Sequence, residues 1–133
     1  MEKEKIVDDL TYRIIGCAMR VHAYLGCGFQ EVIYQRALAI EFRKANISFV
    51  REPEMIIFFY EEEIGTRRVD FFVEGKISVE LKATSGLTEL NLTQGLNYLE
   101  AFKVDLGLLI NFGTPSLEIK RLRPPLKKRI LEK

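Results

Sequence analysis

Residues 67–83 decide the fold, and they read Arg-Arg-Val-Asp-Phe-Phe-Val-Glu-Gly-Lys-Ile-Ser-Val-Glu-Leu-Lys-Ala. β-Branched and aromatic side chains are frequent in both halves, which favours two strands, Arg67–Val73 and Ile77–Ala83. Between them stands Glu74-Gly75-Lys76, whose central glycine suits a tight loop. We therefore expect an antiparallel hairpin over this stretch.

The register of this hairpin brings two acidic side chains together. If the loop has three residues, Val73 pairs with Ile77, and counting outward places Asp70 directly opposite Glu80. Because side chains alternate along a strand, Lys82 points to the same face as Glu80. Two carboxylates whose side-chain roots are about 5 Å apart repel each other unless a positive charge lies between them.

Two explanations fit this cluster. Mg²⁺ prefers oxygen ligands and binds through one or two carboxylates plus substrate phosphate, so Asp70 and Glu80 would suffice as its side-chain ligands, with Lys82 placed to orient water. Alternatively, Glu80 forms an exposed salt bridge with Lys82 or Arg68, and a register shifted by one residue would separate it from Asp70. The spacing alone leaves both open.

Outward from the hairpin, hydrophobic periodicity predicts the remaining elements. Steps of three and four residues predict helices over Lys3–Leu25, from after Gly28 to about Ala45, and over Thr88–Phe102. Alternating or continuous apolar runs predict strands at Phe49–Arg51, Met55–Tyr60, Leu106–Ile110 and Leu117–Leu122, with a turn at Glu61–Glu63. This order suggests an α/β fold, a mixed central β-sheet flanked by helices on both faces.

Composition limits the partners that the chain can have. The 133 residues are 47% hydrophobic, which suits a single domain over residues 1–133. The 20 basic and 19 acidic residues leave a net charge of +1, so bulk charge does not predict non-specific nucleic-acid binding. A short basic tail from about residue 124 could follow a nucleic-acid backbone or could simply be solvated.

Cysteine usage and the N-terminus indicate the compartment. Cys17 and Cys27 lie at the ends of one helical segment, about 15 Å apart along its axis, which is too far for a disulfide. Met1–Lys5 lacks the pattern of a signal peptide, and no apolar run approaches the roughly 18 residues of a membrane span. We expect a reduced, cytoplasmic protein that does not enter a membrane. His22, the single histidine, is better explained as a structural residue than as a base.

The helix over Thr88–Phe102 has a polar face that includes Asn91, Gln94 and Tyr98. An amide and a phenol one turn apart could bind phosphate oxygens or brace the carboxylates. An ordinary exposed stripe would have the same pattern, and from the residues alone it is favoured.

The second helix offers one further acid. Glu31 and Tyr34 lie on one face of it, so Glu31 could join the metal site. If Gly28 is the N-cap, however, Glu31 is the third helical residue, where a carboxylate reaches back to free N–H groups and suits the helix dipole. From the residues alone, capping is the favoured role.

Taken together, these segments resemble the GxxExxY proteins, a branch of the PD-(D/E)XK nuclease-like superfamily. The resemblance covers nearly the whole chain. It rests on Val21-His22, on Gly28, Glu31 and Tyr34, on Arg68-Val69-Asp70, on Val79-Glu80-Leu81-Lys82-Ala83, on Gln94 with Tyr98, and on Leu108-Leu109-Ile110-Asn111-Phe112. The chain departs from the pattern at Val69, where the superfamily has proline, and at Asn91, where this branch has histidine.

The resemblance implies a restriction-endonuclease-like core and a metal-dependent nuclease. In such an enzyme Asp70 and Glu80 would hold Mg²⁺, with Mn²⁺ as a substitute, and the Leu81 carbonyl would add a ligand. Lys82 would assist the attacking water, and Glu31 would contribute from the helix as a catalytic acid and further ligand.

The resemblance also implies roles for the supporting residues. Gln94 and Tyr98 match the Gln-x-x-x-Tyr element of exonuclease-like members, and Tyr34 would support Glu31. The expected substrate is nucleic acid, DNA in the first place, and a homodimer could grip duplex DNA. The competing expectation is a non-catalytic module that keeps the fold and binds nucleic acid or a protein.

Overall fold

The computed structural model describes residues 2–124, so the basic tail expected from about residue 124 lies, beyond Pro124, outside the described residues. The helices are α1 (Glu2–Leu25), α2 (Glu31–Lys44) and α3 (Glu89–Phe102). The strands are β1 (Phe49–Arg51), β2 (Glu54–Phe59), β3 (Glu62–Arg68), β4 (Phe71–Val73), β5 (Ile77–Lys82), β6 (Leu106–Asn111) and β7 (Glu118–Leu122).

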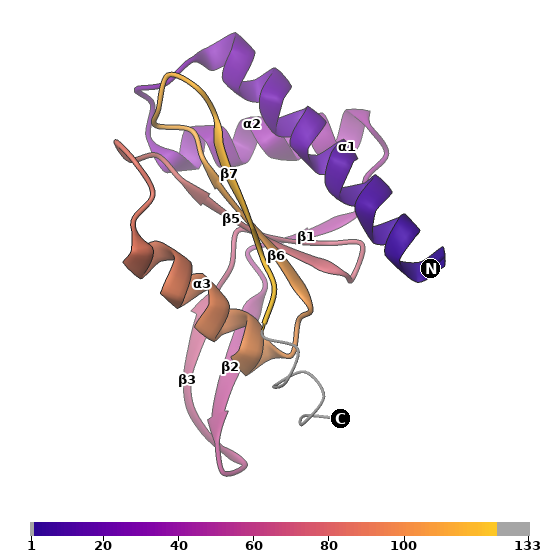
Figure 1. Ribbon diagram of the computed structural model, residues 1–133, viewed down its shortest axis with the longest axis vertical. Coiled ribbons are helices and arrows are strands. Elements are labelled where there is room, and N and C mark those ends of the chain that lie inside the picture. Colours follow the sequence, from indigo (N-terminus) through magenta and orange to yellow (C-terminus); the bar gives the residue numbers. More distant parts are fainter. Residues whose placement is uncertain (1, 125–133) are drawn as a thin grey trace.

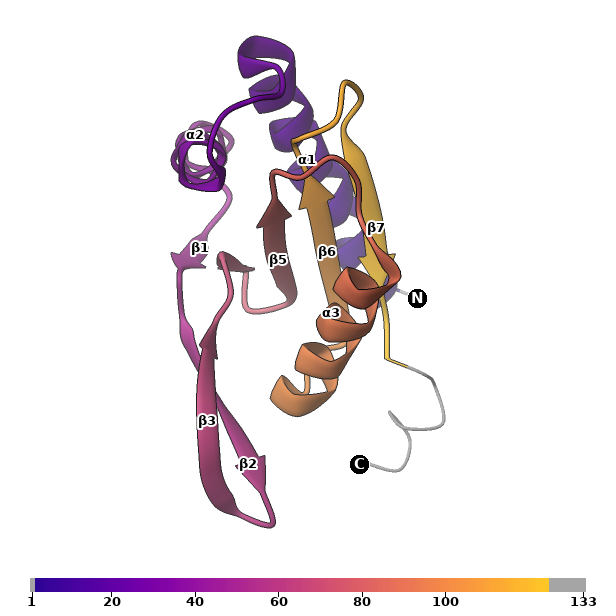
Figure 2. The same cartoon turned by 90° about the vertical axis from the view of Figure 1, so that its left-hand side faces the viewer.

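The main sheet has five strands in the order β1-β4-β5-β6-β7 (Figure 1). β5 and β6 are parallel, and the other neighbours are antiparallel. The parallel pair needs a crossover, which α3 provides. α1 and α2 lie on one face of the sheet and α3 on the other (Figure 2), so the predicted α/β architecture with a mixed sheet and helices on both faces is confirmed.

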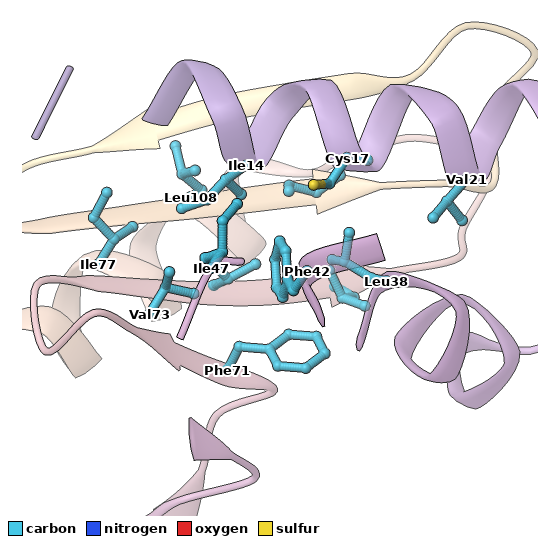
Figure 3. Close-up of a cluster of buried hydrophobic side chains, with 14 of the residues drawn as sticks. Ile14, Cys17, Val21, Leu38, Phe42, Ile47, Phe71, Val73, Ile77 and Leu108 are labelled. Atoms are coloured by element: carbon cyan, nitrogen blue, oxygen red, sulfur yellow. The ribbon is translucent and has the colours of Figure 1, made fainter. Parts of the chain in front are cut away.

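The two faces of β5 have different roles. Ile77, Val79 and Leu81 are fully buried in the larger core, between the sheet and the two N-terminal helices. Figure 3 shows this core, in which Cys17 of α1 and Phe42 of α2 lie among the strand side chains. Because side chains alternate, the polar residues of β5 face α3 instead.

β6 is buried along its whole length, as its uninterrupted apolar run predicts. Leu108 joins the larger core, whereas Leu109 packs with Leu99 of α3 in a second, smaller cluster. The central strands are therefore covered on both faces, and polar side chains are concentrated where the strands end.

One predicted strand is wrong. Arg67–Val73 is not continuous but is divided into β3 and β4 by a bend at Val69 and Asp70. β3 pairs with β2 in a separate two-stranded ribbon that extends away from the main sheet (Figures 1 and 2). The alternating pattern continues through the bend, so periodicity alone could not detect it.

The turns agree only in part with the sequence prediction. Val73 pairs with Ile77, so the three-residue loop around Gly75 is confirmed. The ribbon, however, turns at Tyr60 and Glu61, both with positive φ, and not at Glu61–Glu63. The glutamates that follow join β3 because the exposed ribbon tolerates charged side chains on its surface.

Two further expectations from composition can be compared with the described part of the chain. Cys17 and Cys27 are both free thiols, as their positions predict. Within residues 2–124 there is no helix that is both long and apolar enough to cross a bilayer.

Candidate metal centre

Asp70 lies in the bend that separates β3 from β4. Its Oδ2 accepts a hydrogen bond of 2.7 Å from the Leu81 backbone N–H, and its Oδ1 accepts one of 2.7 Å from Gln35 Nε2. The last ladder pair is Phe71 with Val79. The predicted pairing of Asp70 with Glu80 across two strands is therefore wrong. It stands just beyond the ladder and uses its carboxylate, in place of a backbone carbonyl, to bond β5.

Glu80 projects from β5 towards α3, and its side chain is 17% exposed. Burial raises its pKa to about 7; the charge of Arg67 opposes this rise and that of Asp70 adds to it. Glu80 Oε1 lies 2.9 Å from Arg67 Nη2, yet the geometry is not that of a hydrogen bond, and this oxygen has no hydrogen-bond partner in the described structure. The carboxylate is therefore buried with its charge only partly compensated.

The basic partner of Glu80 is not the one that the sequence suggested. Arg68 points to Glu54, at 3.6 Å, on the exposed face of the ribbon. Arg67, its neighbour in β3, reaches Glu80 instead, and its guanidinium carbon lies 4.1 Å from the centre of the Tyr98 ring. Sequence reasoning missed Arg67 because the bend after β3, which directs it into the site, leaves no periodic signal.

Lys82 ends β5 on the same face as Glu80. Its positive charge opposes the rise in the pKa of both Glu80 and Glu31, which indicates that all three groups lie close together. The Leu81 N–H bonds Asp70, and since the N–H and C=O of one residue point to the same side of a strand, the Leu81 carbonyl is directed towards Asp70 as well. Its orientation supports the proposed backbone ligand.

Glu31 is the first residue of α2, and the N-cap is Gln30 rather than Gly28, so the predicted capping role at the third helical position is wrong. The residue is exposed as a whole, but its carboxyl end lies towards the site. Partial burial and then the charge of Asp70 raise its pKa. Glu31, on a helix, is therefore close enough to Asp70, in the bend, for the two charges to interact.

Tyr34 does not contact Glu31 through any described hydrogen bond. Its hydroxyl donates to the Gly26 carbonyl at 2.5 Å and accepts from the Phe29 N–H at 3.2 Å, and its ring stacks on Phe112. The fully buried tyrosine thus fixes the loop before α2. Its support of Glu31 is indirect, because it sets where the helix begins.

Gln94 and Tyr98, the two residues of the Gln-x-x-x-Tyr element on α3, differ in their surroundings. Tyr98 is half-buried beneath Arg67, whereas Gln94 is exposed and has no described hydrogen bond. Asn91 belongs to a capping box with Thr88: its backbone N–H bonds the Thr88 hydroxyl, and its side chain accepts from the Thr88 N–H. Asn91, which stands where the GxxExxY proteins have histidine, therefore caps the start of α3.

Gln35 contacts the candidate site, although the sequence did not point to it. The side chain is buried; its Nε2 donates to Asp70, and its Oε1 accepts a 2.8 Å bond from Arg51 Nε. Glu52 lies 3.4 Å from the same Nε2. Gln35 follows Glu31 by four residues, so both lie on one helical face, and that spacing could have identified it.

The segment that follows the site is held by Asn111 at the end of β6. Its Oδ1 accepts from the N–H groups of Thr84 and Gly113, at 2.9 and 3.1 Å, and its Nδ2 donates to the Thr84 carbonyl and to Glu118 Oε1, at 3.1 and 2.8 Å. All the hydrogen-bonding groups of this buried amide are in use. Asn111 is therefore a structural anchor for the chain after Lys82.

His22 has a similar structural role. Its Nε2 lies 2.9 Å from the Thr114 carbonyl and its ring lies near Phe112. Both contacts tie α1 to the loop after β6, away from the carboxylates.

The donor set fits a hard cation. Among residues 2–124, no three acidic, histidine or cysteine side chains stand close enough to form a metal site by themselves. Two carboxylates and one carbonyl remain, and Mg²⁺ needs no more from the protein because it keeps several waters. Glu80 Oε1, buried and without a hydrogen-bond partner, is the atom that a cation would satisfy.

The raised pKa of Glu80 leads to a prediction for stability. Its folded-state pKa of about 7 lies above the ordinary value of 4.5, so its contribution to stability is complete below about pH 4.5 and is lost as the pH rises through 7. The difference corresponds to about 3 kcal/mol. In metal-free buffer, Glu80→Gln should therefore gain about this much over the wild type between pH 4.5 and about pH 8.

Urea unfolding at the two pH values measures this gain. Glu62→Gln, at an exposed position of β3, controls for the loss of one carboxylate elsewhere. An equal gain in both variants would show that Glu80 is not the group responsible.

The chain combines a mixed α/β fold with two carboxylates, Asp70 beside the start of β4 and Glu80 on β5. The model of the PD-(D/E)XK nuclease superfamily matches residues 8–122, and the chain therefore belongs to that superfamily. No curated protein matches it in sequence.

Among solved structures, the chain is similar to the crystal structure of SSO0001, with 20% sequence identity and a TM-score of 0.57. The match covers 76% of this chain and 54% of SSO0001, so the chain spans about half the length of that protein. At this identity the likeness concerns the fold alone, which is restriction-endonuclease-like.

Proposed function

We propose that the protein is a Mg²⁺-dependent nuclease that hydrolyses DNA phosphodiester bonds. The observation that carries this proposal is the position of Asp70, just before β4, beside Glu80 on β5. Glu80 Oε1 is buried there without a hydrogen-bond partner. Membership of the nuclease superfamily supports the reaction class. The choice of Mg²⁺ over other cations and of DNA over RNA belongs to the proposal.

The residues of the site would have two kinds of role, holding the cation and assisting the attacking water. Asp70, Glu80 and the Leu81 carbonyl would hold the cation, with Glu31 as a further oxygen donor from α2. When bound, Mg²⁺ would polarise the phosphate and lower the pKa of a coordinated water. Lys82 would hold the attacking water and stabilise the negative charge that develops on the phosphate oxygens.

The outer residues hold these groups in place. Gln35 orients Asp70 through its 2.7 Å hydrogen bond, and the Leu81 N–H fixes the second oxygen of the same carboxylate. Gln94, which is exposed on α3, would contact the nucleic-acid backbone. This division of roles follows the rule that ligating carboxylates are themselves hydrogen-bonded.

The test is hydrolysis of single-stranded, duplex and branched DNA, with RNA alongside, in Mg²⁺, in Mn²⁺ and in a chelator. We expect cleavage of DNA that requires the cation. Activity that persists in both Asp70→Ala and Lys82→Ala would contradict this mechanism.

One observation favours a second candidate, a non-catalytic module that binds nucleic acid or a protein. Both oxygens of Asp70 already accept hydrogen bonds, and Glu80 already faces Arg67. If calorimetry detects no divalent cation on the wild-type protein, with or without DNA, the binding module replaces the nuclease.

Two finer assignments accompany the proposal. Gly28, Glu31 and Tyr34 support the GxxExxY branch, because the tyrosine sets the start of the helix that presents the acid. A homodimer could grip duplex DNA in the cytoplasm, and sedimentation that shows only monomer at high concentration would exclude it.

A further inference from the structure

Arg67 reaches the candidate metal centre from outside the main sheet. It lies on β3, in the ribbon, yet its guanidinium is wedged between the Glu80 carboxylate at 2.9 Å and the Tyr98 ring at 4.1 Å. Its side chain is 28% exposed, whereas that of the adjacent Arg68 is 67% exposed. The ribbon thus delivers one cationic group to the two-carboxylate site.

The contact between Arg67 and Glu80 leaves two buried atoms without partners. Arg67 Nε, a donor, and Glu80 Oε1, an acceptor, are both buried, and neither takes part in a hydrogen bond within the described structure. An arginine and a carboxylate that were each other's final partners would form two parallel N–H···O bonds. Here the charges are close, but the hydrogen bonds are not made.

Each of these atoms calls for a different ligand. A buried carboxylate oxygen beside a second carboxylate suits a cation, and a buried guanidinium N–H suits an anionic oxygen. Leaving such atoms unsatisfied costs free energy, so a ligand that satisfied them would recover it. A divalent cation together with a phosphodiester supplies both partners.

We propose that Arg67 is a substrate-positioning residue: it neutralises Glu80 while no cation is bound, and it turns to a phosphodiester oxygen when a cation takes Glu80. This inference rests on the proposed function. It makes cation and substrate binding mutually reinforcing, because Arg67 opposes the cation alone and assists it once phosphate is present.

Tyr98 supports this movement through its ring. A guanidinium over an aromatic face keeps its attraction while it slides or rotates, because the ring face has no single hydrogen-bonding direction. Tyr98→Leu, which removes the ring face, should therefore resemble the loss of Arg67 in the measurements below.

The first measurement is calorimetric titration of Mn²⁺ alone into the DNA-free protein, at one fixed pH for all variants. Arg67→Gln should bind Mn²⁺ roughly tenfold more tightly than the wild type, because a competing positive charge is removed. Arg67→Lys keeps the charge and should stay close to the wild type. Arg68→Gln, which removes the same charge from the neighbouring exposed position, is the matched control and should change little.

The second measurement is the anisotropy of a fluorescent single-stranded oligodeoxynucleotide at saturating Mn²⁺, with every variant in a Lys82→Ala background to suppress cleavage. Arg67→Gln should bind the oligonucleotide roughly tenfold more weakly than its parent, and more weakly than Arg68→Gln. Opposite effects on the two ligands are not expected of a residue that only stabilises the fold.

The outcomes separate this inference from the function on which it rests. If the wild type binds no Mn²⁺, the proposed function fails. If the wild type binds Mn²⁺ but Arg67→Gln binds it no more tightly, or binds both ligands more weakly, Arg67 does not hold the place of the cation and the inference is wrong. Thermal unfolding of each variant confirms that it is folded at the temperature used.

Discussion

Asp70→Ala should abolish cation-dependent DNA cleavage, with a loss of roughly a thousandfold or more in the rate at saturating cation and substrate. Asp70 is held by Gln35 Nε2 and by the Leu81 N–H, both at 2.7 Å, so its carboxylate stands in one position before any cation arrives. Removing a pre-positioned ligand removes both the cation and the charge stabilisation that it would supply, which is worth several kcal/mol.

The same variant should lose stability, and this effect must be separated from catalysis. Without the carboxylate, the Leu81 N–H loses its acceptor and Gln35 Nε2 keeps only the longer bond to Glu52, at a cost of about 1–3 kcal/mol. Cleavage and Mn²⁺ binding should therefore be measured well below the midpoint of thermal unfolding. Asp105→Ala makes the same chemical change at an exposed position and should retain full activity. Cleavage at the wild-type rate by folded Asp70→Ala would exclude Asp70 as a ligand.

Gly113→Ala should be the most destabilising single methyl group that can be added near the site. A Cβ at Gly113 would lie 2.6 Å from the Ala83 carbonyl carbon and closer still to the Thr84 N and O atoms. These are backbone atoms that cannot move aside, since Asn111 bonds both the N–H and the C=O of Thr84. We expect a loss of at least about 3 kcal/mol in the free energy of unfolding.

Gly86→Ala is the matched control for this substitution. A Cβ at Gly86 meets no atom within 4 Å, and its φ is not in the left-handed region, so its stability should change by less than about 0.5 kcal/mol. Urea unfolding of the two variants measures the difference. Similar stability of both would show that the strand ends at Ala83 and Gly113 can separate without cost.

A strained Gly113→Ala protein should also lose activity beyond its loss of stability. The colliding segment directly follows Lys82, and the Phe112 N–H bonds the Lys82 carbonyl at 2.8 Å. Any shift that relieves the collision therefore moves Lys82 relative to Glu80. The variant should cleave more slowly than its folded fraction predicts.

Local patterns were sufficient for the fold class and for the pairing of β4 with β5. The alternation of Ile77–Lys82 predicts which side chains of β5 face α3, and the three-residue loop correctly pairs Val73 with Ile77. The continuous apolar run of β6 predicts burial on both faces. These features depend on neighbours in the chain, so the sequence carries them directly.

The same patterns could not place Asp70 or its helix-borne neighbours. The separation of Asp70 from the ladder depends on a hydrogen bond from Leu81, eleven positions away, and on one from Gln35 on α2. The start of α2 at Glu31 likewise depends on Tyr34, which bonds two backbone groups of the preceding loop. These contacts arise only after the helices have packed on the sheet.

By itself, the sequence determined a mixed α/β chain in which Glu80 and Lys82 share one face of β5, because strand periodicity and loop length are local properties. Only the tertiary structure decided that Arg67, and not Arg68 or Lys82, faces Glu80. The bend after β3 turns the ribbon against α3, and desolvation there raises the pKa of Glu80 to about 7. The residues that bury this carboxylate come from separate elements, and no local pattern records how closely those elements pack.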